Sequence, residues 1–473
     1  MRILHWFRKD LRLDDNTALS EAAHDAAGDV VPFHAEDPAA PARPDASPAR
    51  ARFERDARAA LDADLRRLGS SLGLARGDAT EVVVDAAHAA RADAVYWNDE
   101  YEPRLRERDD RVERALRASG VEVKRFHDRL LVAPGEALTR EGRPYTVYTA
   151  FRRTCEALPV SAPHPAPVRL AAHARPPATA DEPGPAPPGA ATWPAGGDAA
   201  RSRLRRFVSG TGNAPPGLAG YERLRDLPAA RAGSRLSADL EFGTIGVRRV
   251  VAEVRAAAAA EPSFAAAAEK FVAELRWRDF HHHVLFHFPH VEHGCFRREY
   301  DAIEWPGTPE HRDAWRGART GVPIVDAGMR ELHATGFMHN RVRMLAASFL
   351  VKDLLVDWRE GERHFMRHLI DGNLANNNGG WQWTAGTGTD AAPFFRVFNP
   401  VVQGERFDAG GAYVRRWLPE LERVPDAFVH RPWEATAGVL AAAGVVLGET
   451  YPRPLVDHAA QRDRALALYR AVR

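Results

Sequence analysis

The sequence predicts an α/β N-terminal domain with a parallel, Rossmann-like sheet and a large all-α C-terminal domain. Three observations lead to this prediction. Short apolar runs alternate with helical patterns over residues 1–130. The residues Pro, Ala and Gly dominate the stretch 159–197, and helical periodicity prevails after residue 201. Alternating strands and helices are typical of parallel sheets covered on both faces. We therefore expect an N-terminal domain over 1–130, an interdomain linker over 131–200 and a helical domain over 201–473.

The short apolar runs Ile3–Phe7 and Val30–Phe33 predict the first strands of this domain, and Ala94–Trp97 and Val121–Phe126 are also expected to be strands. Apolar side chains recur at helical spacing between residues 50 and 68, and 104–117 reads as a charged helix. Val82–Val84 is too short to classify. No Gly-rich dinucleotide fingerprint follows the first strand, so ordinary NAD binding is not expected.

Helical patterns fill the second domain, and the clearest cover Val247–Ala260, Ser263–Phe286, Ile324–Thr335, Arg341–Trp358 and Glu362–Leu369. Proline fixes φ and removes backbone donors, so no regular element is expected in the Pro-rich connection before them. The segment 371–390 is dense in asparagine, which does not favour a helix interior unless the amides find partners. A polar cofactor would supply such partners, and an Asn-rich loop is the alternative.

Composition excludes several classes of protein. Two cysteines among 473 residues cannot form a disulfide framework or a four-cysteine metal centre. No stretch is long and apolar enough for a membrane span, and no secretory signal opens the sequence, so we expect a cytoplasmic protein. The net charge of +1 does not by itself indicate a nucleic-acid partner. Arginine, which suits phosphate, supplies most of the basic residues, although GC-rich coding would produce the same excess.

Three further segments carry candidate chemistry. The segment GSRLSADLEFG places serines around an arginine before a predicted helix, which could hold a pyrophosphate or merely cap the helix. Glu274, Trp277 and Arg278 share one helical face and could bind a base, although a half-buried indole beside an ion pair is the simpler interpretation. The segment MHNRVRM again shows helical spacing. The histidines at 281–283 lack ligand partners, so no metal site is expected.

Taken in order, these segments resemble the photolyase/cryptochrome flavoprotein family. The resemblance runs from WFRKDLRLDDNTAL through YTVYTAFRR, TGVPIVDAGMREL, ATGFMHNRVRMLAASFLVKDLLVDWREGE and the Asn/Trp segment to FNPVVQGERFD. It covers nearly the whole chain except the Pro-rich linker, and it is strongest to bacterial class I-type photolyases that repair cyclobutane pyrimidine dimers. It implies a monomeric DNA-repair lyase that uses reduced FAD and blue or near-ultraviolet light.

The resemblance also implies the residues that surround FAD: Tyr221, Gly233, Ser234, Arg235, Leu236, Ser237, Asn340, Arg343, Asp371, Gly372, Asn373 and Asn377. Among these, Asn377 would face the flavin N5, and Arg343 would balance negative flavin charge with Asp371 as its ionic partner. A tryptophan relay would run from Trp381 through Trp358 to Trp305. Three positions depart from the family pattern, namely Gly233, Phe271 and Asn373.

For the substrate, the resemblance implies a pyrimidine dimer flipped out of DNA. The implied contacts are Arg225, Glu274, Trp277, Arg278, Asn340, Arg341, Met344, Trp383 and Arg396, with Glu274 and Asn340 on the pyrimidine edges and the two tryptophans as stacking walls.

Two alternatives stay within the family. An enzyme for the (6-4) photoproduct would carry a histidine pair at positions 340 and 344, and a plant-type cryptochrome photoreceptor would carry Asp at 377. Many relatives hold a second, antenna chromophore. Arg104, Leu105 and His293 replace residues of the common folate site, so a deazaflavin, a folate, another flavin or no antenna stay open.

Overall fold

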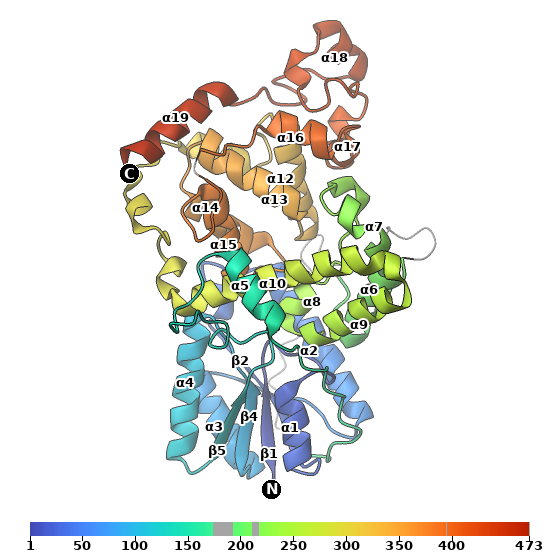
Figure 1. Ribbon diagram of the computed structural model, residues 1–473, viewed down its shortest axis with the longest axis vertical. Helices are drawn as coiled ribbons and strands as arrows, with labels where there is room; N and C mark the ends of the chain where they lie inside the picture. Colours follow the sequence, from blue (N-terminus) through green and yellow to red (C-terminus); the bar gives the residue numbers. More distant parts are fainter. Residues whose placement is uncertain (174–192, 211–216, 394, 473) are drawn as a thin grey trace. The chain divides into compact units, whose positions relative to one another are not determined.

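The computed structural model describes residues 1–173, 193–210, 217–393 and 395–472 (Figure 1). The chain divides into two compact units. The first comprises Met1–Ala219 and Ser234–Pro289, and the second comprises Gly220–Gly233 and His290–Arg473. These bounds differ from the predicted domains, because a long helical stretch up to Pro289 belongs with the N-terminal sheet. Among the described residues, no helix is both long and apolar enough to cross a membrane.

A five-stranded parallel sheet organises the first unit, with the strand order β3-β2-β1-β4-β5. Its strands are β1 (Ile3–Phe7), β2 (Val30–Glu36), β3 (Gly73–Arg76), β4 (Ala94–Asn98) and β5 (Glu122–Phe126). The parallel sheet and its four predicted strands are confirmed. The sequence pattern misses β3, whose four residues include Gly73 and Arg76, and Val82–Val84 lies in a helix.

The helices of the first unit are α1 (Thr17–Asp25), α2 (Pro48–Arg67), α3 (Ala79–Ala90), α4 (Pro103–Ala118), α5 (Tyr148–Ala157), α6 (Gly197–Ser209), α8 (Ser237–Phe242), α9 (Val247–Ala260) and α10 (Ala265–His287). Side chains alternate along β1: Ile3 and Phe7 pack with α1 and α2, whereas Leu4 and Trp6 pack with α3 and α4. Figure 1 shows α1, α3 and α4 beside the strands of the sheet.

In the Pro-rich part of the predicted linker, the described residues 159–173 and 193–196 form no helix or strand, as predicted. The linker as a whole, predicted over 131–200, does contain regular structure. Helix α5 forms inside it, and buried Phe151 and Cys155 line one side of that helix. Helix α6 begins at Gly197, before the predicted end of the linker. The rest of the Pro-rich prediction falls partly on 174–192, which lies outside the described residues.

The second unit is helical and surrounds one apolar core. Its helices are α11 (Pro309–Arg316), α12 (Pro323–Thr335), α13 (Asn340–Ser348), α14 (Trp358–His368), α15 (Leu374–Ala385), α16 (Pro400–Phe407), α17 (Ala412–Trp417), α18 (Ala437–Ala443) and α19 (His458–Ala471), while α7 (Gly217–Leu224) spans the boundary between the units.

The single helix predicted over Arg341–Trp358 is wrong. Helix α13 ends at Ser348, a π-helical stretch covers Phe349–Asp353, and α14 starts at Trp358. Leu355 takes a left-handed φ of 55°, which ends the helical path. Asp357 then caps α14 by accepting a hydrogen bond from the backbone N–H of Arg359. Apolar periodicity continues across this break, so periodicity alone could not locate it.

Candidate functional site

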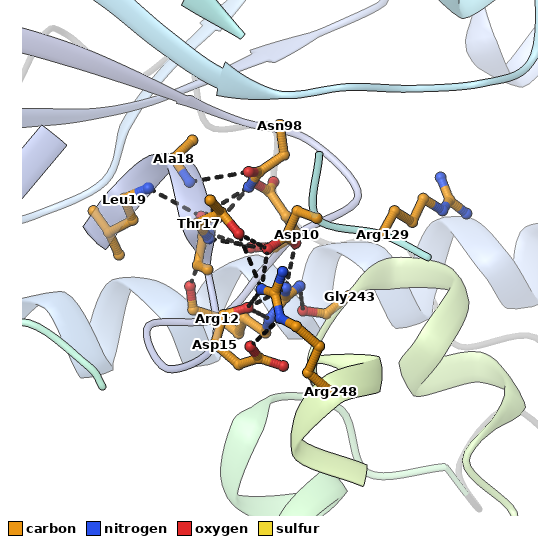
Figure 2. A network of polar contacts seen from close by, with 12 residues as sticks. Asp10, Arg12, Asp15, Thr17, Ala18, Leu19, Asn98, Arg129, Gly243 and Arg248 are labelled. Atoms are coloured by element: carbon orange, nitrogen blue, oxygen red, sulfur yellow. Dashed lines mark hydrogen bonds and ion pairs between the residues drawn. The ribbon is translucent and has the colours of Figure 1, made fainter. Parts of the chain in front are cut away.

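A network of buried charges lies at the carboxyl ends of β1 and β4 in the first unit (Figure 2). The Arg248 guanidinium contacts Asp15 and Asp128, each at 2.7 Å. Arg12 pairs with the same Asp128 and donates to the carbonyl of Gly243 at 3.1 Å. The turn after β1 is therefore tied to α9 and to the residue that follows α8. In doubly wound sheets this edge commonly holds a ligand, whereas here the protein's own ions occupy it.

Asp128 is ionised within this network. Burial alone would raise the pKa of its carboxyl group, but Arg12, Arg248 and two hydrogen bonds from Thr17 hold the pKa well below its usual range. The sequence WFRKDLRLDDN looks like an exposed charged turn, and only the resemblance marks it as important. The ion pairs of this network join residues more than 100 positions apart, so no local sequence pattern predicts them.

The segment around Ser234–Ser237 is held in a constrained turn before α8. Arg235 has a φ of 59°, a left-handed conformation that is uncommon outside glycine. The Ser234 hydroxyl accepts from the backbone N–H of Leu236 at 3.4 Å. Helix α8 itself is anchored by Asp239, whose two carboxylate oxygens each lie 2.8 Å from buried Arg203. These four candidate FAD residues, 234–237, belong to the first unit, whereas Tyr221 and Gly233 belong to the second.

Helix α10 places Glu274, Trp277 and Arg278 on neighbouring positions, as the spacing predicts. Trp277 is half-buried, and Tyr148 stacks on one ring face with centroids 3.6 Å apart. Arg278 forms hydrogen bonds within the first unit: it donates to the carbonyls of Arg129 at 2.9 Å and Leu240 at 3.3 Å. These hydrogen bonds hold the Arg278 guanidinium in place, and its role as a phosphate contact stays a prediction.

Two of the three neighbouring histidines on α10 are buried. His282 is buried and its Nδ1 bonds the carbonyl of Arg278 at 2.9 Å. His283 is buried as well, and its Nε2 accepts from the backbone N–H of Tyr145 at 3.1 Å. Internal hydrogen bonds therefore account for these two rings.

Helix α13 carries the predicted charged pair of the second unit. The Arg343 Nη2 lies 3.1 and 2.9 Å from the two carboxylate oxygens of Asp371, and its Nε donates to the carbonyl of Met338 at 2.7 Å. Asp371 is 5% exposed and Arg343 24% exposed at the side chain. Asn340 and Met344 lie one turn apart, with Nδ2 and Sδ separated by 3.9 Å.

The Asn-rich segment forms helix α15, so the loop alternative is wrong. Asn373 caps the helix, and its side chain accepts from the backbone N–H of Asn376 at 3.0 Å. Asn378 donates to Glu362 Oε1 at 3.0 Å and to the carbonyl of Val291 at 2.9 Å. The protein itself thus supplies most of the amide partners that a cofactor was expected to supply.

Asn377 and Glu362 stand out within this cluster. The amide nitrogen of Asn377 donates to the carbonyl of Glu362 at 3.0 Å, while its Oδ1 accepts no hydrogen bond from any described residue. Burial raises the pKa of Glu362 to about 7, against the hydrogen bond from Asn378. Nothing in the sequence marked Glu362, because its partners are 15 or more positions away along the chain.

The three relay tryptophans share the core of the second unit. Trp358 and Trp381 are buried in that core, and half-buried Trp305 packs against it. The rings nearest to Trp381 are Phe365, at a centroid distance of 5.0 Å, and Trp315, at 6.1 Å. Sequence reasoning did not single out Trp315.

The remaining predicted DNA contacts of the second unit differ in exposure. Arg341 lies 3.0 Å from Asp226, which also faces Arg225 at 3.9 Å. Trp383 is half-buried and Arg396 is exposed. A carboxylate between two guanidiniums lowers the local positive charge, so Arg396 is the more available phosphate contact of the set.

Comparison with known proteins identifies the chain. The protein-family model for DNA photolyase matches residues 3–169, and the family model for the FAD binding domain of DNA photolyase matches residues 271–471. A deoxyribodipyrimidine photo-lyase of Agrobacterium fabrum is 40% identical over 490 residues, which cover 100% of this chain and 98% of the relative. This chain belongs to the photolyase/cryptochrome family.

Solved structures of the family agree with this assignment. A class III photolyase from Agrobacterium tumefaciens has a TM-score of 0.93 and 40% identity, covering 100% of this chain and 97% of the other. An archaeal photolyase from Sulfolobus tokodaii, solved with two FAD molecules, has a TM-score of 0.82 and 33% identity, with 100% of both chains covered. Because the first neighbour is described as class III, the class I-type subclass stays a prediction.

FAD is the cofactor of this family domain, and the residues present fit it. The described Asn377 Oδ1 is an acceptor without a protein partner, and the Arg343 guanidinium is partly exposed next to its buried carboxylate. A Cβ added at Gly233 would meet no atom within 4 Å outside its two chain neighbours. The donor set thus offers a cation, an amide oxygen and open space, as an anionic flavin with a pyrophosphate requires.

Proposed function

We propose that this chain is a deoxyribodipyrimidine photo-lyase that repairs cyclobutane pyrimidine dimers in DNA by light-driven electron transfer. The observation that carries the proposal is the full-length match, at 40% identity, to a curated relative of that name. Such a match covers both units, so it is more specific than any one motif. DNA as the substrate follows from this activity.

The residues of the site would divide the work as follows. Reduced FAD, when bound, would supply the electron that light transfers to the dimer. Arg343 would hold positive charge beside the flavin, and Asp371 would fix the guanidinium in place. Asn377 would offer its Oδ1 as a neutral acceptor, with the amide held by its bond to the carbonyl of Glu362. Trp381, Trp358 and Trp305 would carry the electron that reduces the flavin.

The lesion would be held by flat rings and amides. Tyr148 stacks on one ring face of Trp277, and the other face would serve as a stacking wall for a flipped base. Trp383 would form the second wall. Asn340 and Met344 lie one turn apart on α13 where a (6-4) enzyme would carry its histidine pair. Without a histidine there, the proton donor of that chemistry is missing, which favours the cyclobutane lesion.

A light-dependent repair assay tests the proposal. The FAD-loaded, reduced protein is mixed with an oligonucleotide that carries one thymine dimer and is kept in the dark or under near-ultraviolet light. Recovery of thymine absorbance only in the light is the expected result. DNA binding without recovery would favour the (6-4) lesion, and absence of DNA binding would favour a cryptochrome-type photoreceptor.

Trp277→Ala should weaken binding of dimer-containing DNA about 5- to 150-fold, because base–aromatic stacking contributes about 1–3 kcal/mol per base. Fluorescence anisotropy with a labelled oligonucleotide measures the affinity in the dark. Trp433→Ala removes another half-buried indole, which lies outside the proposed site, and should leave the affinity unchanged. Equal losses in the two variants would remove Trp277 from the substrate site.

A further inference from the structure

Three histidines of the second unit converge between two helices. His333 lies on α12, and His364 and His368 lie one turn apart on α14. One ring nitrogen from each lies within 4.8 Å of the other two, and no other group of three potential ligands was found in the part of the chain that the structure describes. The i, i+4 spacing of His364 and His368 places both rings on the same helical face.

The spacing of the nitrogens suits a tetrahedral ion. The Nε2 atoms of His333 and His364 are 3.3 Å apart. Zinc–imidazole bonds of about 2.0–2.1 Å at tetrahedral angles place two ligand nitrogens about 3.3–3.4 Å apart. Two neutral imidazoles could share a hydrogen bond at that distance, but such a pair needs no third ring. The His368 ring centroid lies 4.3 Å from that of His364 and 5.0 Å from that of His333.

The surroundings prepare the rings for metal binding. The Nδ1 of His368 bonds the carbonyl of His364 at 2.9 Å, which requires the proton on Nδ1 and leaves the lone pair on Nε2. His333 is exposed and gives solvent access to the cluster.

The ligand set selects the class of ion. All three candidates are imidazoles, which suit zinc, copper and nickel, whereas calcium and magnesium require oxygen ligands. Two cations, Arg316 and Arg367, act on His364. Arg316 is already paired with Glu360 at 2.6 Å, which offsets its charge. Neutral ligands beside these two cations favour moderate affinity.

We propose that His333, His364 and His368 form a binding site for a divalent transition-metal ion of the zinc class, with one open coordination position. This site is separate from the proposed repair function and departs from the sequence-based expectation of no metal. A bound ion would join α12 to α14. It would also lie near the relay, because the His364 ring contacts Trp315 at 5.3 Å and Trp315 contacts Trp381 at 6.1 Å.

Calorimetric titration of Zn²⁺ into chelator-treated, FAD-loaded protein tests the site. We expect one ion per chain for the native sequence and a loss of affinity of more than about 100-fold in His333→Ala, since even outer-shell partners cost about 10–100-fold. His333 is exposed, so this variant should fold. His333→Cys should retain binding, because a thiolate also ligates zinc. His88→Gln, an exposed histidine on α3, should bind as the native chain does.

A second measurement distinguishes this site from adventitious binding. Zn²⁺ should raise the thermal midpoint of the native chain and of His88→Gln but not of His333→Ala, because an ion stabilises only the fold that binds it. Absence of Zn²⁺ binding to the native chain, or equal binding by His333→Ala, would overturn the proposal. Both readouts are made in the dark without DNA, so they do not depend on repair activity.

Discussion

The polar side chains buried in the first unit are mostly charged, whereas those buried around α15 in the second unit are mostly amides. In the first unit Arg12, Arg248, Asp15 and Asp128 contact one another or backbone carbonyls. In the second unit Asn378 and Gln382 bond backbone carbonyls and each other. Both arrangements satisfy the rule that buried polar groups need partners.

The two arrangements differ in whether a polar atom is left without a hydrogen-bond partner among the described residues. The charged network closes on itself, and its ions hold the turn after β1 against α9. The amide cluster ends at Asn377, whose nitrogen is bonded and whose Oδ1 is not. A neutral acceptor presented in this way can serve a ligand without adding an ionisable group. The first arrangement therefore fits a scaffold role, and the second fits the cofactor role proposed above for Asn377.

Breaking the charged network should have the largest effect. Asp128→Asn leaves Arg12 and Arg248 buried without their shared anion, so the free energy of unfolding should fall by about 3–5 kcal/mol. Urea denaturation followed by circular dichroism measures the loss. Glu253→Gln breaks an exposed ion pair with Arg249 and should cost less than about 1 kcal/mol. A loss as small in Asp128→Asn would mean that the network does not support the fold.

The same carboxylate sets a pH dependence. Its folded pKa is depressed, so its stabilising effect is fully present above its unfolded pKa of about 3.9 and is lost as pH falls from there toward the folded value. Asp128→Asn should lack this part of the acid-induced loss.

Arg343 differs from the amides around α15, because it forms an ion pair with Asp371 at the proposed cofactor site. Arg343→Gln removes a charge-assisted contact of about 1.5–3 kcal/mol, so FAD affinity should fall about 10- to 150-fold. Equilibrium dialysis with flavin absorbance measures it. Arg462→Gln removes a half-exposed arginine on α19 and should bind FAD normally. Unchanged affinity in Arg343→Gln would separate the ion pair from flavin binding.

Glu362 is the titratable member of the amide cluster. Its folded pKa of about 7 lies above the unfolded value, so the native chain should lose stability as pH rises from about 4.5 to 7. Glu362→Gln keeps the shape and a carbonyl acceptor, so it should exceed the native chain by about 1–3 kcal/mol at pH 8 and match it near pH 4.5. Urea midpoints across this pH range test the prediction, and parallel profiles would contradict it.

Periodicity predicted much of the fold because apolar alternation and helical spacing are local properties. It failed where the chain departs from regular geometry without a change in hydrophobicity, as at the π-helical stretch Phe349–Asp353 and at Leu355. It also failed at β3, which is too short to carry a pattern.

The site residues also divide into those that could be predicted from the sequence and those that could not. The pairing of Arg343 with Asp371 was predicted from the resemblance and is present. Glu362, Trp315 and the pairing of Asp128 with Arg248 were missed, because their partners are distant in sequence and their residue types are common. Spacing predicted the shared helical face of Glu274, Trp277 and Arg278, but it could not predict that the distant carbonyls of Arg129 and Leu240 accept hydrogen bonds from Arg278.

The smallest effect is expected at Gly233, where the family resemblance implies a Thr or Ser that donates to FAD. A side chain there meets no atom within 4 Å, and the backbone is not left-handed, so Gly233→Ser should be tolerated. If the cofactor lacks a donor at this point, the new hydroxyl should raise FAD affinity about 2- to 10-fold, since one hydrogen bond contributes about 0.5–1.5 kcal/mol. Gly233→Ala controls for the reduced freedom of the unfolded chain, which can stabilise the fold without contacting FAD. Equal FAD affinity in the Ser and Ala variants would show that no flavin group reaches this position.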